Sequence, residues 1–209
     1  VVAGARAPWY GVLEAPEGGI TRDELIPLTV AEAALLDAVL AAYPRSLRDP
    51  ARFPPEAFHF KGASRRLGAG VSSFPVLRFY VLLEGPTAAV EDDWLLEVKE
   101  LPEPAAYGAW APWPQRPFAD NAERAVLAQR TWQGSAQAYP LLGHVTVPPM
   151  AFRIRHRTKH QKGVDVGRIT EKLAEGDWAP DDVVEFATVA GRLLARGHGQ
   201  SPTLRGGPP

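Results

Sequence analysis

The chain has 209 residues, of which 45% are hydrophobic and 22% are charged, and its formal net charge is -1 at pH 7. This composition excludes wholesale disorder and fibrous repeats, and the near-zero net charge argues against a general polyanion binder. No apolar run is long enough to span a bilayer, and no signal-peptide pattern opens the chain. The absence of cysteine excludes disulfides, Cys-ligated metals and thiol nucleophiles, and a cytoplasmic location is the default expectation.

The first regular element that the sequence predicts is a helix after Thr29. Thr29 and Glu32 have the spacing of a capping box, in which each side chain binds the backbone N–H of the other residue. Apolar residues then recur at helical spacing until Pro44, which ends the helix. Residues 1–26 show weak periodicity and are expected to be irregular.

Two hairpins and a second helix follow in the predicted order. Strands are expected over residues 76–83 and 94–100, because both runs carry β-branched and aromatic residues. Asp120 and Glu123 have the spacing of another capping box and start the second helix. Residues 141–156 predict a second hairpin that turns at two consecutive prolines.

The last helix is expected to begin near Pro180 and to end at Gly199. Its predicted buried stripe consists of Val183, Ala187, Ala190, Leu194 and His198. Because the predicted strands adjoin in sequence, the order helix, two strands, helix, two strands, helix favours an α+β fold with an antiparallel sheet.

Four segments are expected along the chain. Residues 1–57 are helical or irregular, residues 58–162 hold the sheet and the second helix, residues 163–201 are helical, and residues 202–209 form a disordered tail. The Gly- and Pro-rich composition of the last segment is the reason for expecting no packed structure there.

A glycine-rich segment, a strand lysine and a helix carboxylate form the pattern with the most chemistry. Glycines let backbone N–H groups approach phosphate oxygens, a lysine neutralises phosphate charge, and a carboxylate orients the lysine. The candidate residues, in chain order, are Gly68, Gly70, Ser72, Ser73, Lys99 and Glu123.

Each part of this pattern also has a structural explanation. A Gly-x-Gly run is common in turns, and a strand lysine flanked by acids is commonly solvated. Glu123 is already explained as a helix cap, and Gln129 is a rival partner for Lys99.

Several short runs, in this order, resemble the uncharacterised bacterial family DUF2252. The runs are residues 66–73 (RLGAGVSS), 95–100 (LLEVKE), 123–130 (ERAVLAQR), 142–143 (LG), 153–155 with Lys162, and 191–198 (GRLLARGH). The resemblance covers roughly residues 58–201.

That family is considered kinase-like, so the resemblance implies an N-lobe sheet followed by the first helices of a C-lobe. Lys99 would lie on the third strand and contact the α- and β-phosphates of ATP bound with Mg. The backbone of residues 68–73 would cover these phosphates, and Glu123 would orient Lys99. Arg153 and Arg155 would lie near the hinge and the adenine pocket. The kinase pattern has a third glycine where this chain has Ser73.

The larger departure from the kinase pattern concerns catalysis. Phosphoryl transfer needs a base or positioning Asp and further Asp or Asn ligands for magnesium. In the family these resemble Gly-Asp-x-His-x-x-Asn and Asp-Phe-Asp-Glu runs, which this chain lacks, and Gln200 replaces the carboxylate of a His-Gly-Asp run. We therefore expect a nucleotide-binding fragment that is inactive alone, and Val1 in place of Met agrees with a fragment.

The alternative hypothesis is a non-enzymatic module that binds a protein partner. It would use the basic hairpin over residues 153–162 or the Trp- and Pro-rich loop over residues 101–118, which includes Trp110 and Trp113. Without an aromatic platform beside the basic residues, a nucleic-acid partner is disfavoured.

The basic row itself has two interpretations. Arg153, Arg155, Arg157 and Lys159 alternate, so a strand places them on one face, where they can grip phosphate. The same row is typical of a solvated hairpin edge that discourages aggregation. A metal site at the interleaved histidines is disfavoured, because no carboxylate or cysteine is near them in sequence.

Overall fold

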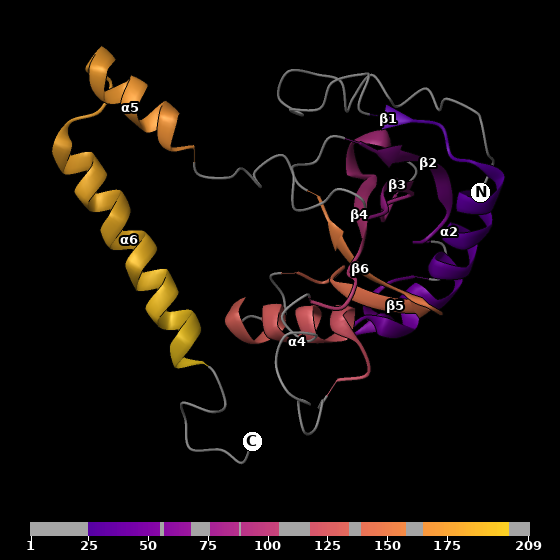
Figure 1. The fold of residues 1–209 in the computed structure, drawn as a ribbon. Coiled ribbons are helices and arrows are strands. Elements are labelled where there is room, and N and C mark those ends of the chain that lie inside the picture. The colour runs from indigo at the N-terminus through magenta and orange to yellow at the C-terminus, as the bar shows by residue number, and fades with distance from the viewer. Residues whose placement is uncertain are drawn as a thin grey trace. The chain divides into compact units, whose positions relative to one another are not determined.

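A computed structural model describes residues 25–54, 57–67, 76–87, 89–104, 118–133, 139–157 and 165–200. These residues form a six-stranded antiparallel sheet and four α-helices, so the chain has an α+β fold, as predicted (Figure 1). The elements are β1 (Leu25–Ile26), α2 (Val30–Ala42), β2 (Phe60–Arg66), β3 (Arg78–Leu83), β4 (Trp94–Glu100), α4 (Asn121–Gln133), β5 (Gly143–Val147), β6 (Met150–His156), α5 (Val166–Glu175) and α6 (Pro180–Gly199).

The strands lie in the order β1-β2-β3-β4-β6-β5, and every neighbouring pair is antiparallel. β2, β3 and β4 pair in chain order, whereas β6 pairs with β4 and leaves β5 at the edge. Arg153 and Arg155 therefore lie on an interior strand. The interpretation of their row as a solvated hairpin edge is wrong, because β6 pairs with β5 on one side and with β4 on the other. Its backbone N–H and C=O groups are therefore hydrogen-bonded on both sides.

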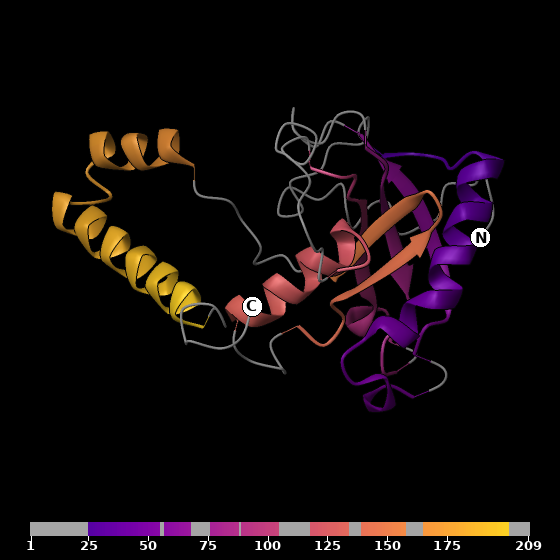
Figure 2. The same cartoon turned by 60° about the horizontal axis from the view of Figure 1, so that its bottom comes forward.

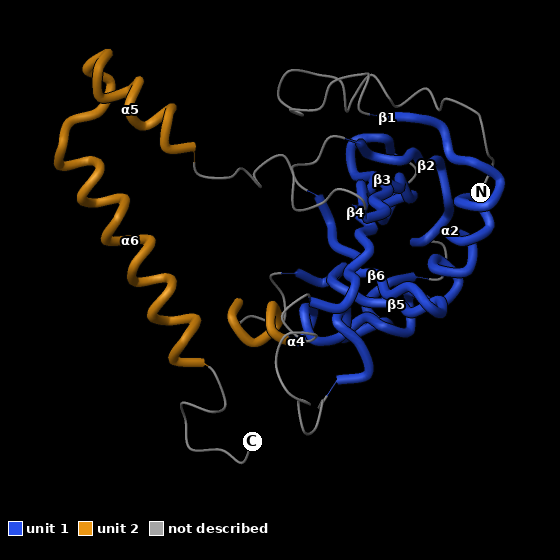
Figure 3. The backbone as a smooth tube through the Cα atoms, in the orientation of Figure 1, with its two compact units in different colours: residues 1–127, 136–159 blue, residues 128–135, 160–209 orange. Residues whose placement is uncertain are grey.

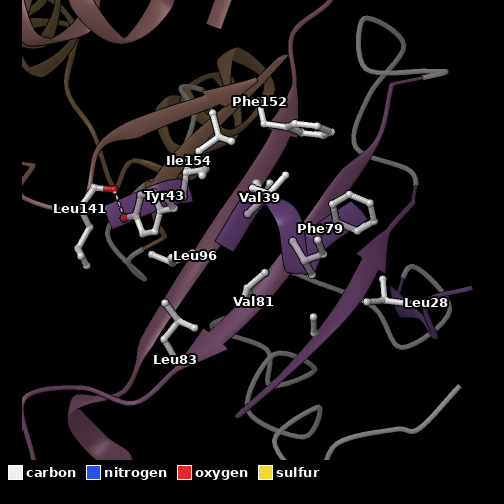
Figure 4. Packing of buried hydrophobic residues seen from close by; sticks show 14 of the residues in the cluster. Leu28, Val39, Tyr43, Phe79, Val81, Leu83, Leu96, Leu141, Phe152 and Ile154 are labelled. Carbon is white, nitrogen blue, oxygen red and sulfur yellow. Dashed lines mark hydrogen bonds between the residues drawn. The ribbon is translucent and has the colours of Figure 1, made fainter. Parts of the chain in front are cut away.

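The hydrophobic core lies between α2 and one face of the sheet. Side chains alternate along each strand, and Phe79, Val81 and Leu83 of β3 are turned toward α2 together with apolar residues of β4 and β6 (Figure 4). Val39 of α2 packs into the middle of this cluster. Tyr43, at the end of the helix, is buried and donates a hydrogen bond from its hydroxyl to the carbonyl oxygen of Leu141 (2.7 Å).

The first predicted capping box is complete, whereas the second is present only in its Asp120 half, because the Glu123 carboxylate binds the backbone N–H of Ala119. The Glu32 backbone donates to the Thr29 hydroxyl (3.2 Å), and the Thr29 backbone donates to the Glu32 carboxylate (2.9 Å). In α4 the Asp120 carboxylate accepts from the backbone N–H of Ala122 (2.8 Å) and Glu123 (2.9 Å). Local spacing was sufficient for these predictions because a cap involves residues only three positions apart.

Gly143, which belongs to the Leu-Gly pair noted above, lies where β5 passes the end of α2. A Cβ at this position would collide with the Ser46 hydroxyl and lie 2.9 Å from the Tyr43 ring. The backbone N–H of His144 donates to the same Ser46 hydroxyl (3.1 Å). A close approach of backbone to side chain therefore explains the glycine.

Three features differ from the predicted order of elements. β2 was not predicted as a strand, because its sequence, FKGASRR, lacks β-branched residues and is held in the sheet by pairing with β3. The short β1 and the helix α5 are additional elements. α6 has the predicted bounds, but its predicted stripe is not buried: Val183 is half-buried, and Ala187, Ala190, Leu194 and His198 are exposed. Helical spacing places residues on one face without supplying what covers that face.

The chain divides into two compact units (Figure 3). Residues 1–127 and 136–159 form unit 1, and residues 128–135 and 160–209 form unit 2. In unit 2, Asp165 caps α5, and Gly176 ends it in a left-handed conformation (φ 80°), which favours glycine. The His198 ring lies edge-on to Trp132, with 5.8 Å between ring centroids.

Candidate functional site

The face of the sheet opposite α2 carries polar side chains in two rows that cross the strands. Alternation places these residues on that face, because their neighbours along each strand belong to the hydrophobic core. The register aligns Arg78, Lys99, Arg153 and His144 in one row, and Ser64, Tyr80, Glu97 and Arg155 in the next.

Glu97 lies at the centre of this face, and three arginines surround its carboxylate. Arg155 donates from Nε to Oε1 (2.8 Å), Arg153 donates from Nη2 to the same oxygen (3.3 Å), and Arg78 places Nη1 3.6 Å from Oε2. The Glu97 side chain is 2% exposed. Burial alone would raise the pKa of Glu97, but the charge and hydrogen bond of Arg155 and the charges of Arg78 and Arg153 lower it. Glu97 is therefore held as a carboxylate.

Cationic side chains gather around Lys99 in the part of the chain that the structure describes. Burial, and after it the charges of Arg78 and Arg153, lower the pKa of Lys99, whereas the Glu97 carboxylate raises it in part. Among the described residues, the Glu97 carboxylate thus lies near three guanidinium groups and one ammonium group on a half-buried face. Such a surface favours an anion, because the ligand offsets both the repulsion and the lost hydration of the cations.

The opposite end of the same face is apolar. Leu82 and Leu95 are register neighbours one row beyond Tyr80 and Glu97, and both are half-buried. The Arg157 guanidinium lies over the Tyr80 ring, 5.2 Å from its centroid, and the Arg157 backbone donates to the Leu95 carbonyl (2.8 Å). The face therefore changes from cationic to apolar along the strands.

The strand ends that flank the glycine-rich segment in sequence lie at the cationic end of this face. Gly68, Gly70, Ser72 and Ser73 lie outside the described residues, but β2 ends at Arg66 and β3 begins at Arg78. Lys99 is the register partner of Arg78. The strand ends on either side of the segment are thus at the same end of the sheet as Lys99.

Glu123 has a contact other than the predicted one. Its carboxylate accepts a hydrogen bond from the backbone N–H of Ala119 (2.6 Å), which fits its role as a cap. α4 runs beside the β5–β6 hairpin (Figure 2), and its capping residue Asp120 accepts a hydrogen bond from the Thr146 hydroxyl. The partnership of Lys99 with Glu123 or Gln129 stays a prediction.

Sequence reasoning missed Arg78 and Glu97. Glu97 stands two positions before Lys99 in a strand, so alternation alone places both on one face. Arg78 required the register of β3 against β4, which the sequence did not reveal. A glutamate inside the otherwise apolar run over residues 94–98 was the available signal in the sequence.

Other candidate residues are only partly covered by the structure. Lys159, His160 and Lys162 lie outside the described residues, as do Trp110 and Trp113. Burial lowers the pKa of His156, so this imidazole favours the neutral form.

Within the described ranges, no three His, Asp or Glu side chains are grouped so that they could hold a metal ion. None of the described helices has the length and apolarity needed to cross a membrane.

Comparison with known families identifies the chain. The model of a family described as an uncharacterised protein conserved in bacteria, DUF2252, matches residues 19–205. The chain belongs to DUF2252. The family predicted from short runs is thereby confirmed, and the match begins nearer the N-terminus than the DUF2252-like runs did. No curated protein and no solved structure gives a significant match to this DUF2252 chain.

Proposed function

We propose that this DUF2252 member is a kinase-like nucleotide-binding protein that holds the phosphates of ATP, with Mg, against the cationic face around Lys99. The observation that supports the proposal most strongly is a row of cations on a half-buried face, in which Lys99 lies between its register partners Arg78 and Arg153. Guanidinium and ammonium groups are the side chains that bind phosphate, through charge and directed hydrogen bonds.

The position of the site within the sheet supports a nucleotide in particular. Phosphates would lie at the row of Arg78, Lys99 and Arg153, at the end of the sheet where residues 67–77 connect β2 to β3. The base would lie on the apolar end of the face, over Leu82 and Leu95. A ligand with a polyanionic tail and a flat apolar head matches this change in polarity.

The described residues are proposed to bind the nucleotide but not to catalyse phosphoryl transfer. Glu97 is engaged by three arginines that lower its pKa, so it is a poor general base. The sequence also lacks the Gly-Asp-x-His-x-x-Asn and Asp-Phe-Asp-Glu runs that the resemblance associates with catalysis. Transfer would require carboxylates supplied by sequence outside this chain.

The alternative of an interaction module has less support. Arg153 and Arg155, which it would present to a partner, both contact Glu97 within the sheet. Residues 105–117 of the Trp- and Pro-rich loop and residues 158–164 of the basic hairpin lie outside the described residues. No described contact favours a protein partner at either segment.

Calorimetric titration with ATP–Mg tests the proposal. The wild-type chain is expected to bind, and Lys99→Ala is expected to abolish measurable binding. Lys61→Ala is the matched control, because Lys61 is also a strand lysine but pairs with Asp93 (2.6 Å). Absence of wild-type binding would reject the nucleotide proposal and favour the interaction module. Equal loss in both variants would show that Lys99 has no specific role.

A further inference from the structure

We propose that Arg153 is the guanidinium that contacts phosphate directly, that Glu97 is its positioning residue, and that Arg155 serves to anchor Glu97. This inference deepens the proposed function and rests on it. The two arginines lie on the same strand and the same face, but their contacts differ, and this difference divides their roles.

The contacts of Arg155 identify it as the anchor of Glu97. Its Nε donates to Oε1 at 2.8 Å, which is the shortest contact in the cluster. Its register partner on β4 is Glu97 itself. A guanidinium engaged at this distance with a buried carboxylate would have to break that ion pair to bind a ligand.

The contacts of Arg153 leave hydrogen-bonding capacity for a ligand. It reaches Glu97 only through Nη2, at 3.3 Å. Its Nε is buried and has no hydrogen-bond partner among the residues that the structure describes. A buried donor without an acceptor is costly, and a phosphate oxygen is an acceptor that removes this cost.

The neighbours of Arg153 also distinguish it from Arg155. Its register partners are Lys99 on β4 and His144 on β5, so it lies in the cationic row at the end of the sheet where β2 ends and β3 begins. Arg155 lies one row further along, beside Glu97. A phosphate at Lys99 is therefore adjacent to Arg153.

The charges also indicate the class of ligand. Arg78, Lys99 and Arg153 are successive register partners in one row. Three cations in one row match a chain of two or three phosphates better than a single phosphate or a carboxylate. The row therefore suits the di- or triphosphate chain of the proposed nucleotide.

Matched substitutions of the two arginines test this division of roles by calorimetry with ATP–Mg and with inorganic tripolyphosphate. Arg153→Gln is expected to raise Kd for both ligands by about tenfold or more, because a charge-assisted contact is lost. Arg155→Gln is expected to change Kd by no more than about threefold while it lowers Tm, because Glu97 loses its nearest donor. Arg153→Lys keeps the charge but not Nε, and it is expected to lie between wild type and Arg153→Gln.

The outcomes separate this inference from the proposed function. If wild type binds ATP–Mg and Arg155→Gln weakens binding as much as Arg153→Gln, the division of roles is wrong while nucleotide binding stands. If Arg153→Gln does not fold, Arg153→Lys decides, since unchanged affinity in that variant would also overturn the role of Nε. If wild type binds neither ligand, both proposals fail.

A pH profile tests Glu97 as a positioning residue. Binding is expected to weaken as pH rises and Lys99 loses its proton. Because the Glu97 charge raises the pKa of Lys99, Glu97→Gln is expected to move the midpoint of this loss to lower pH. A purely structural role would reduce stability and leave the midpoint unchanged, which would contradict this part of the inference.

Discussion

The two faces of the sheet use adjacent residues of the same strands for opposite purposes. Toward α2, Phe79 is fully buried among apolar side chains (Figure 4), and so is Val98 of the neighbouring strand. On the other face, Arg78 and Glu97 stand one position away in an ion-pair cluster. Burying charge is less favourable than burying hydrocarbon, so the second face is a poor source of stability. The α2 face therefore supplies most of the stability of the fold, and the charged face is the one on which we propose binding.

The largest expected effect is on the α2 face. Phe79→Ala removes a fully buried ring and should lower the free energy of unfolding by about 4 kcal/mol. Leu82→Ala, on the other face of the same strand, is half-buried and should cost much less. Urea denaturation measures both. Equal losses would mean that the two faces contribute alike to stability.

Glu97→Gln should give the largest effect on the charged face, a loss of about 2–3 kcal/mol, because it leaves three guanidinium groups without their anion. The arginines lower the folded-state pKa of Glu97 below its ordinary value of 4.5. Its stabilisation is therefore fully present above that value and is lost as pH falls through the lowered one. Urea titrations of wild type and Glu97→Gln should show that the difference in their free energies of unfolding is smaller at about pH 3 than at about pH 7. A constant difference would contradict this assignment.

Tyr43→Phe tests whether the apolar core affects stability without affecting binding. The buried Tyr43 hydroxyl donates to the Leu141 carbonyl across the core. Removing it leaves that carbonyl without this donor and should cost about 1 kcal/mol, without change in ATP–Mg affinity. Thermal unfolding and calorimetry check the two halves of the prediction. Reduced affinity would mean that the core and the binding face are coupled.

Lys99→Met should have the smallest effect on stability, within about 1 kcal/mol of wild type and not destabilising, because burial and neighbouring arginines disfavour this cation. Since the folded-state pKa of Lys99 lies below its ordinary value of 10.5, wild-type stability should rise with pH between the two values. The variant should lack this rise. Lys61→Met should instead lower stability slightly, because Asp93 stabilises that ammonium. A clear loss in Lys99→Met would refute the description of this face.

The parts of the fold that were predictable depend on neighbours in sequence. The Thr29–Glu32 cap, the strand at residues 94–100 and the hairpin at residues 141–156 follow from spacing and residue type. β2 was not predictable in this way, because β3 holds it in the sheet despite its low strand propensity. Spacing also placed the stripe of α6 on one face, but exposure depends on partners that spacing does not specify.

The candidate site was likewise predictable only where it depends on residues close together in sequence. Alternation placed Arg153 and Arg155 on one face, and Lys99 was identified from its strand. Their convergence on Glu97 depends on β6 pairing with β4, which is a contact between segments more than fifty residues apart. The counter-charge was therefore sought on the following helix, at Glu123, whereas the structure places a carboxylate on the lysine's own strand.

The proposed function depends on Lys99 being a partly desolvated cation that binds phosphate. NMR of the protein labelled with ¹³C at lysine Cε reports the pKa of its Nζ, and Lys99→Met assigns the signal. We expect a pKa below 10.5 in the free protein that rises when ATP–Mg binds. A pKa of 10.5 or above, unchanged by ATP–Mg, would contradict it.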